Sequence, residues 1–250
     1  MEHMNCSMKF KMLELNQYYN MDNTNGMQEF PDKFFELAIV DCPYGTGEDG
    51  SKNHTRTKLS TAKDYTPVQN NRVPGNEFFE ELFRVSKNQI IWGANHFISK
   101  VPIDSSCWIV WDKVNGKNDF ADCELAWTSF NSATRIFRYM WQGMNQGKSI
   151  SEGHIMQGDK SKNEKRIHIH QKPIPLYIWT LQNYAKQGWN ILDTNVGSAS
   201  SLIACKMLNF DYVGFEIDKH IYDLSNKRLE DYKKQIHIDD LIEKQVKMEV

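Results

Sequence analysis

The stretch NILDTNVGSAS, residues 190–200, joins a short apolar strand to the start of a helix. A second apolar strand, 212–217, follows this helix and ends in acidic residues. A strand, a helix and another strand in this order form a βαβ unit, whose two strands are parallel and whose crossover is right-handed. The last third of the chain therefore predicts an α/β fold, with a mostly parallel sheet flanked by helices.

The turn between this strand and the helix, 193–200, has features of a nucleoside-binding loop. Its small residues let a ligand approach the backbone, and the helix N-terminus offers free N–H groups. Glu216 ends the next strand about twenty residues on, where an acid commonly binds ribose hydroxyls. Only Gly197 stands inside the turn, so S-adenosylmethionine, which has no pyrophosphate, fits better than NAD. A plain strand-to-helix turn with a capping serine is an equally good interpretation of the turn alone.

A second strand end carries a different kind of chemistry. The apolar run 34–40 predicts a buried strand, and Asp41-Cys42-Pro43-Tyr44 follows it directly. A carboxylate accepts hydrogen bonds from an amino group, and a proline fixes the backbone so that a neighbouring carbonyl can point at the same group. A tyrosine ring can lie flat on a planar base. Because ligands of open α/β sheets bind at the carboxyl ends of strands, these residues predict a clamp for an exocyclic amine.

Together, the two strand ends resemble those of the amino-group DNA methyltransferases, which use S-adenosylmethionine. The Asp-Pro-Pro-Tyr motif of that family is matched by 41–44, its Gly-rich cofactor turn in part by 193–200, and its Gln-Lys-Pro element by 171–173. The catalytic motif precedes the cofactor turn, an order similar to that of the circularly permuted β class. The resemblance, which covers roughly 34–218, implies a Rossmann-like S-adenosylmethionine-dependent methyltransferase fold.

The resemblance also implies roles for individual residues. The catalytic clamp is Asp41, Cys42, Pro43 and Tyr44, in which the Asp41 carboxylate and the Cys42 carbonyl hold the amino group and Tyr44 stacks on the base. Cofactor binding is assigned to Asp41, His170, Gln171, Lys172, Asp193, Asn195, Val196, Gly197, Ser198, Ala199, Ser200 and Glu216. An acid at position 41 favours adenine N6 over cytosine N4, because cytosine enzymes of this family more often carry serine there.

Three positions depart from the family pattern. Cys42 replaces the first proline, which is tolerable because the main-chain carbonyl, not the side chain, would hold the base. Asn195 and Ala199 stand where the family more often has phenylalanine and glycine. A missing aromatic ring would weaken packing on the cofactor adenine, and alanine would restrict the backbone if position 199 needs a positive φ. A non-catalytic DNA-binding subunit that has lost its cofactor is therefore a competing hypothesis.

Two polar regions are expected to contact double-stranded DNA, the substrate that the resemblance implies. Residues 46–75 form a long loop, interpreted as mobile, with Lys52 and Arg56 as candidate phosphate contacts. Residues 142–169 are interpreted as a small target-recognition insertion, whose candidate contacts are Lys160, Lys162, Lys165 and Arg166. A solvated face is the competing interpretation of both basic runs.

The composition limits the class of protein. With 250 residues, 40% hydrophobic and 25% charged, the chain is expected to form a single catalytic domain over 1–250. No apolar run is long enough to cross a bilayer and 1–10 lacks a signal-peptide core, so a cytoplasmic location is expected. Five scattered cysteines argue against a disulfide framework or a zinc site. A net charge of −2 is compatible with DNA binding through a local basic patch.

Two further features carry weaker signals. His168 and His170 lack a third ligand nearby, so structural histidines are a better interpretation than a metal site. The charged helix from Lys219 onward is interpreted as solvated, although it could support a homodimer. A cognate restriction endonuclease is a further candidate partner.

Apolar periodicity predicts the remaining elements. Helices are expected at 21–30, 76–86, 173–186 and 198–208, the third of them ended by Gly188. Strands are expected at 11–19, 89–93, 107–111, 125–128 and 135–141. Most of the tryptophans fall in these strands and are expected in the core.

Overall fold

The computed structural model describes residues 12–46, 72–101, 104–115, 121–142, 145–147 and 164–248. Its main sheet has eight strands in the order β1-β10-β9-β2-β3-β5-β4-β6. The first five strands of this order run parallel: β1 (Gln17–Asn20), β10 (Asp211–Glu216), β9 (Asn190–Asp193), β2 (Phe35–Val40) and β3 (Ser86–Trp92). The sheet continues through β5 (Cys123–Thr128), which is antiparallel to both of its neighbours, to β4 (Trp108–Asp112) and β6 (Arg135–Arg138). The predicted mostly parallel sheet is confirmed.

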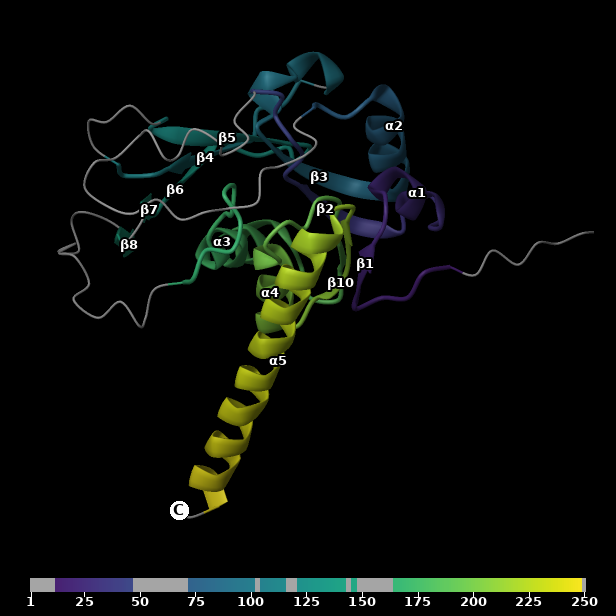
Figure 1. Ribbon diagram of the computed structural model, residues 1–250. Helices are drawn as coiled ribbons and strands as arrows, with labels where there is room; N and C mark the ends of the chain where they lie inside the picture. Colours follow the sequence, from purple (N-terminus) through teal and green to yellow (C-terminus); the bar gives the residue numbers. More distant parts are fainter. Residues whose placement is uncertain are drawn as a thin grey trace, which may run out of the picture.

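Helices cover both faces of this sheet (Figure 1). One face carries α1 (Asn23–Gln28) and α2 (Asn76–Val85). The other face carries α3 (Ile174–Tyr184), α4 (Ser200–Met207) and the start of α5 (Lys219–Met248). Two short 3-10 turns, Ala94–His96 and Ile98–Lys100, follow β3.

The central strand β2 shows why its sequence is a continuous apolar run. Leu37 and Ile39 face the core beneath α3 and α4, whereas Ala38 and Val40 face the core beneath α1 and α2. A strand with helices on both sides buries both sets of side chains, so apolar and polar residues do not alternate along it. The tryptophans buried in the core, as predicted, are Trp92, Trp111, Trp127 and Trp141.

The strand order of the sheet reverses between β9 and β2, because the crossovers that leave these two strands run toward opposite edges of the sheet. From β9 the chain crosses through α4 to β10 on one side, and from β2 it crosses through α2 to β3 on the other. The two strands pair in parallel, with Ile39 opposite Asp193. Ligands of open α/β sheets bind outside the carboxyl ends of strands at such a switch point. The predicted amine clamp and the predicted cofactor turn therefore leave the sheet side by side.

Some predicted boundaries are wrong, each for a local reason. The helix predicted from 198 begins at Ser200, because Ala199 has a left-handed backbone with φ 63° and ψ 20°. The helix predicted to run to 186 ends at Tyr184, because Ala185 is extended with φ −107° and ψ 157°. Gly188, expected to end that helix, instead has φ 83° in the turn before β9.

The single strand predicted over 135–141 is two strands. β6 pairs with β4, but β7 (Met140–Gln142) leaves the sheet and pairs with β8 (Asn145–Gly147) in a separate ribbon. The break falls at Tyr139, whose N–H donates to the Asp112 carbonyl at the end of β4. At the N-terminal end, β1 begins at Gln17, later than the strand predicted over 11–19.

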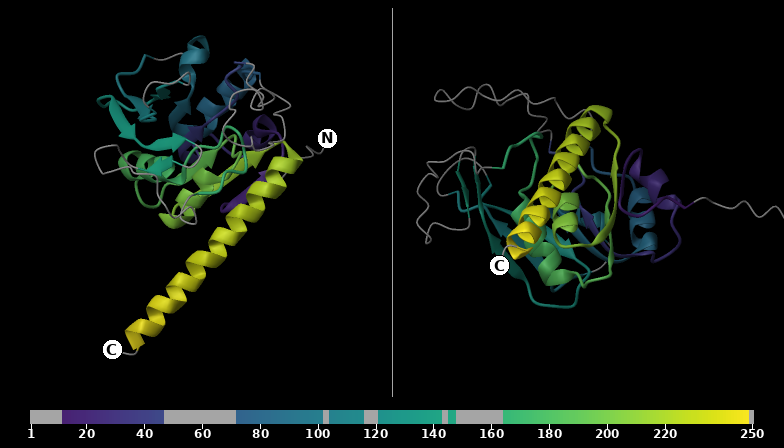
Figure 2. Two further views of the ribbon diagram at one scale, coloured as in Figure 1. Left: turned by 60° about the vertical axis from the view of Figure 1, so that its left-hand side comes forward. Right: turned by 90° about the horizontal axis from the view of Figure 1, so that it is seen from below.

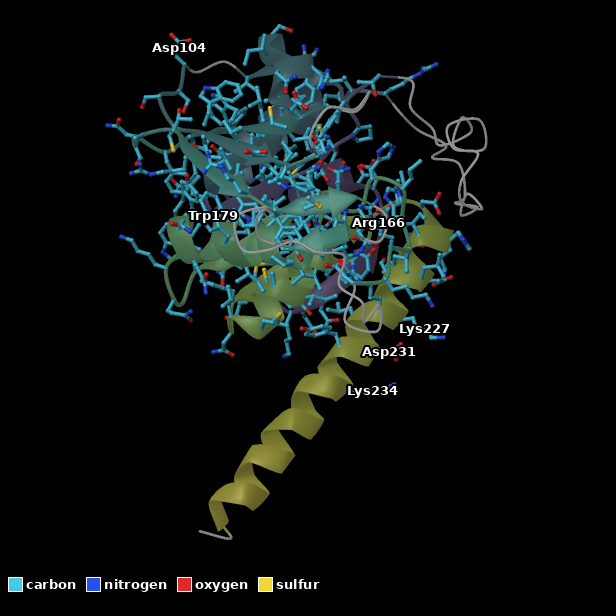
Figure 3. All side chains as sticks on the ribbon, turned by 90° about the vertical axis from the view of Figure 1, so that its left-hand side faces the viewer. Asp104, Arg166, Trp179, Lys227, Asp231 and Lys234 are labelled. Atoms are coloured by element: carbon cyan, nitrogen blue, oxygen red, sulfur yellow. The ribbon has the colours of Figure 1, made fainter. Side chains whose placement is uncertain are left out.

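The helix α5 extends away from the sheet (Figure 1 and the left view of Figure 2). Its exposed residues Lys227, Asp231 and Lys234 mark the stretch where it leaves the body (Figure 3). No helix within the described part of the chain is long and apolar enough to cross a membrane. Most of the predicted mobile loop and recognition insertion, 47–71 and 148–163, lies outside the described residues, and so do Lys52, Arg56, Lys160 and Lys162.

Candidate active site

Asp41, at the end of β2, receives two hydrogen bonds on one carboxylate oxygen. The Tyr44 hydroxyl donates to Asp41 Oδ1 at 2.8 Å, and the ammonium of Lys172 donates to the same oxygen. Among the described residues, no hydrogen bond reaches the other oxygen, Oδ2. The protein thus orients the carboxylate through Oδ1 and leaves Oδ2 available to a ligand.

Lys172 lies just before α3 and is almost completely buried, with 5% of its side chain exposed. Besides Asp41, its Nζ donates to the Tyr44 hydroxyl at 2.9 Å and lies 3.2 Å from Glu124 Oε2. Burial alone would lower the pKa of Lys172, but Asp41 and Glu124 raise it above its ordinary value. Lys172 is therefore a protonated amine held between two carboxylates.

Glu124, on β5, was not predicted from the sequence. Its second carboxylate oxygen, Oε1, lies 2.6 Å from Nζ of Lys113, which follows β4. Burial would raise the pKa of Glu124, but Lys172 and Lys113 lower it to about 2. Glu124 is therefore ionised at neutral pH, as a second negative charge beside the clamp.

The Tyr44 ring is packed on two sides. It stacks on the His96 imidazole, with ring centroids 5.3 Å apart and planes 13° apart. It also lies against Gly93, which follows β3 with φ 70°. Burial, and then the charges of Asp41 and Glu124, raise the pKa of Tyr44 well above its ordinary value. The hydroxyl therefore stays protonated and serves as a donor to Asp41.

Cys42 is 1% exposed, in the core between the sheet and the helices α1 and α2. Burial, and then the charge of Asp41, raise the pKa of its thiol to about 12. The neutral thiol thus packs as a small apolar group. This placement agrees with the expectation that the Cys42 side chain has no part in holding a base.

The predicted cofactor turn after β9 is fixed by short-range hydrogen bonds. Asp193 accepts from the backbone N–H of Asn195 at 2.9 Å and from the Ser201 hydroxyl. The Gly197 N–H donates to Glu216 Oε2 at 3.0 Å, which ties the turn to the end of β10. Each oxygen of Glu216 retains acceptor capacity beyond the backbone N–H that it binds. The turn therefore brings an acid and a half-buried glycine backbone together.

The two departures from the family pattern have different consequences. Ala199 does occupy a position with positive φ, 63°, which a glycine would adopt without a steric cost. The Asn195 side chain accepts hydrogen bonds from Thr194 Oγ1 at 2.8 Å and from Asn23 Nδ2 at 3.3 Å, which ties the turn to α1. Asn195 thus stabilises the turn by hydrogen bonding, without an aromatic ring.

Residues 84–227, more than half of the chain, match the family model described as DNA methylase, N6_N4_Mtase. The chain belongs to this DNA methylase family. The matched residues include the cofactor turn, Lys172 and Glu124, and begin after Asp41.

Two curated methylases and one solved structure are similar to this chain. The type II methyltransferase M.HpaI of Haemophilus parainfluenzae is 23% identical over 232 residues, covering 82% of this chain and 71% of that protein. M.HinfI of Haemophilus influenzae is 24% identical over 250 residues, covering 88% and 69%. A DNA modification methylase of Thermus thermophilus, solved with S-adenosyl-L-methionine, superposes with a TM-score of 0.52 at 16% identity, covering 86% of this chain and 95% of that one. The predicted methyltransferase fold is confirmed.

The methylase ties its predicted cofactor turn to α5 through a network that sequence reasoning missed. Arg228 of α5 donates to Ser200 Oγ at 3.1 Å and to the Ser198 carbonyl, and it bonds Glu164 at 2.5 Å. Glu164 also accepts from the Ile174 N–H at the start of α3, at 3.0 Å. In the sequence, Glu164 stands inside a basic run that favoured DNA contact, so its role between two helix N-termini had no local signal.

The residues of the Gln-Lys-Pro element and of the segment before it differ in whether their side chains are buried or exposed. Gln171 is buried and its amide bonds the Ile167 N–H at 2.8 Å and Glu164 at 2.8 Å, whereas His170 is exposed. Arg166 lies against the body (Figure 3), with its guanidinium 4.4 Å from the Trp141 ring centroid. Of the predicted DNA contacts in this segment, only Lys165 is fully exposed among the described residues.

Proposed function

We propose that this DNA methylase transfers a methyl group from S-adenosylmethionine to N6 of adenine in double-stranded DNA. The observation that carries the proposal is the parallel pairing of β2 and β9, with Ile39 opposite Asp193. This pairing puts the Asp41 clamp and the 193–200 turn at adjacent strand ends. A methyl donor in the turn and an amino group at the clamp would therefore be neighbours.

The turn suits a nucleoside ligand without pyrophosphate. At Gly197, an added Cβ would meet, among the described residues, only the Asn195 carbonyl, at 4.0 Å, so the backbone there is open to a ligand. Glu216, at the end of β10, offers carboxylate oxygens for ribose hydroxyls. When bound, S-adenosylmethionine supplies an electrophilic methyl group on a sulfonium. His170, Gln171 and Lys172 remain predicted cofactor contacts, although the Lys172 ammonium lies at Asp41.

At the clamp, Asp41 would act on the target amino group. The nitrogen lone pair of an adenine amino group is delocalised into the ring, and hydrogen bonds to Asp41 Oδ2 and the Cys42 carbonyl would localise it. Bound S-adenosylmethionine would supply the methyl group to this nitrogen from its sulfonium, and Asp41 or water would accept the proton that the amino group releases. Most of the acceleration would come from positioning and from the negative charge of Asp41 opposite a developing positive charge.

The target base must leave the duplex to reach this clamp. Flipping costs about a few kcal/mol, and stacking on an aromatic side chain returns roughly 1–3 kcal/mol of it. Tyr44 is the proposed stacking ring, and its stacking on the His96 imidazole supports its suitability for packing against a planar group. Lys52, Arg56, Lys160, Lys162, Lys165 and Arg166 remain proposed DNA contacts, and a homodimer and a partner endonuclease remain predictions.

The test is transfer of labelled methyl from S-adenosylmethionine to unmodified amplified DNA, followed by digestion and chromatography of the nucleosides. The wild-type chain is expected to yield N6-methyldeoxyadenosine, and Asp41→Ala is expected to yield none. Asp32→Asn is the matched control, because Asp32 is an exposed carboxylate that bonds Arg84 away from the clamp.

Other outcomes would replace the proposal with a different function. Label on N4 of cytosine would establish the cytosine-N4 alternative. Calorimetry that detects no S-adenosylmethionine binding would favour the non-catalytic DNA-binding subunit. The ordered turn, in which Asn195 is hydrogen-bonded to its neighbours through both side chain and backbone, argues for binding.

A further inference from the structure

The clamp contains a second carboxylate, Glu124, which the proposed transfer does not use. Asp41, Lys172, Glu124 and Lys113 form a chain of alternating charges, linked by the Asp41–Lys172 contact and by distances of 3.2 Å and 2.6 Å. The four side chains come from the loop after β2, the segment before α3, β5 and the end of β4. A buried ammonium shared between two carboxylates is costly to assemble unless both partners are in place.

We infer that Glu124 is a positioning residue that acts through Lys172 and keeps the negative charge of Asp41 available to the target amino group. The inference rests on the proposed methyl transfer and assigns a role within that same site. Lys172 is needed to orient Asp41 through Oδ1, yet its positive charge opposes the function of that carboxylate. Glu124 balances this charge from the other side of the ammonium.

The electrostatic reason lies in the charge that develops during transfer. As the new N–C bond forms, the amino nitrogen becomes positive, and a nearby carboxylate stabilises it. An ammonium bonded to that carboxylate nearly cancels its field if the two groups form an isolated pair. With Glu124 3.2 Å from Lys172 and 2.6 Å from Lys113, the two carboxylates balance the two ammonium groups. Without Glu124, Asp41 would face two ammonium groups, and the three remaining groups together would carry one positive charge.

A purely structural role for Glu124 predicts something different. Glu124 pairs with Trp111 across β4 and β5, and its bond to Lys113 also joins these strands. If it served only to hold the strands together, its loss would reduce stability and the fraction of active protein. It would not change the rate of the chemical step in the protein that remains folded, and removing the Lys172 charge as well would not restore that rate.

The test is the single-turnover rate of methyl transfer at saturating S-adenosylmethionine and DNA, normalised to the folded fraction. Glu124→Gln, which keeps the size of the side chain, is expected to slow transfer about tenfold or more. The double variant Glu124→Gln with Lys172→Met removes the unbalanced ammonium and is expected to recover part of this loss. A calorimetric Kd for S-adenosylmethionine, measured for each variant, sets the saturating concentration, so that a change at the predicted cofactor contact Lys172 does not enter the measured rate.

Glu36→Gln is the matched control. Glu36 forms an ion pair with the more exposed Lys87, at 2.9 Å, near the opposite end of β2. Its loss is expected to leave the single-turnover rate unchanged.

Each remaining outcome separates the inference from the proposed function. A folded wild-type chain that transfers no methyl group to DNA overturns both. An active wild type with an equally fast Glu124→Gln variant overturns the role of Glu124 alone. A slow Glu124→Gln variant whose double variant is equally slow or slower also overturns it, because charge balance then does not explain the loss.

Discussion

The Tyr44 ring lies directly against the backbone of Gly93, so that a Cβ built on Gly93 would come within 2.2 Å of a ring carbon. Gly93 follows β3, the strand beside β2, so the contact joins the ends of two neighbouring strands. The absence of a side chain at Gly93 therefore lets the Tyr44 hydroxyl reach Asp41.

We expect Gly93→Ala to displace the Tyr44 ring and release one of the two hydrogen bonds on Asp41 Oδ1. A displacement of about 1 Å near reacting groups can cost about 100-fold in rate, so transfer should fall by about this factor. Backbone strain at φ 70° should also reduce stability by about 1–2 kcal/mol. Methyl-transfer rates and urea unfolding measure the two effects separately.

The control for this variant is Gly188→Ala. Gly188 has φ 83°, but an added Cβ there would meet no atom within 4 Å in the described part of the chain. It should therefore show the loss of stability without the loss of transfer. Equal transfer rates in the two variants would contradict the proposed role of Gly93.

Ala199 stores backbone strain at the start of α4. Replacing it with glycine should relieve about 1–2 kcal/mol of left-handed strain, while losing a buried methyl worth about 0.8 kcal/mol and adding unfolded-state freedom worth about 0.5–1 kcal/mol. These effects nearly cancel, so Ala199→Gly should change the free energy of unfolding by less than about 1 kcal/mol. Ala204→Gly, on the same helix and equally buried, has no strain to relieve and should lose about 1–2 kcal/mol. Urea unfolding of both variants checks the difference, and equal losses would show that position 199 is unstrained.

Asp193 should make stability depend on pH. Burial raises its pKa more than the hydrogen bonds from Ser201 and Asn195 lower it, and Asp41 and Glu216 add to the rise, which reaches about 7. Between pH 4 and 7, approximately, the folded chain therefore keeps a proton that the unfolded chain releases. By linkage, this group's contribution to stability falls as pH rises through that window and levels off above it.

Asp193→Asn removes this ionisation. Relative to the Asn variant, the wild type should lose stability from pH 5 to pH 8, by a few kcal/mol at most. Urea unfolding of both proteins at several pH values gives the difference curve. A difference that stays constant over this range would show that Asp193 does not titrate there.

Ala199 shows how much of the local backbone conformation the sequence pattern could predict. The sequence indicated a strand-to-helix turn at 193–200 and raised the question of a positive φ at 199. The structure answers that question: Ala199 has a left-handed backbone and directly precedes Ser200, where helix α4 begins. The sequence did not predict the helix end at Tyr184 or the strand break at Tyr139, because neither position is marked by a glycine or a proline.

The sequence by itself determined which strand ends carry the acid and the turn. Strands buried on both faces are continuous apolar runs, and polar or small residues that interrupt such runs mark their ends. Only the tertiary structure decided which distant charges meet at Asp41. Lys172, which bonds Asp41, follows it by 131 residues, and Glu124, which contacts Lys172, lies on an antiparallel strand, so both contacts depend on strand order and register. Local periodicity records which side chains are buried, but not which distant charges meet beneath the surface.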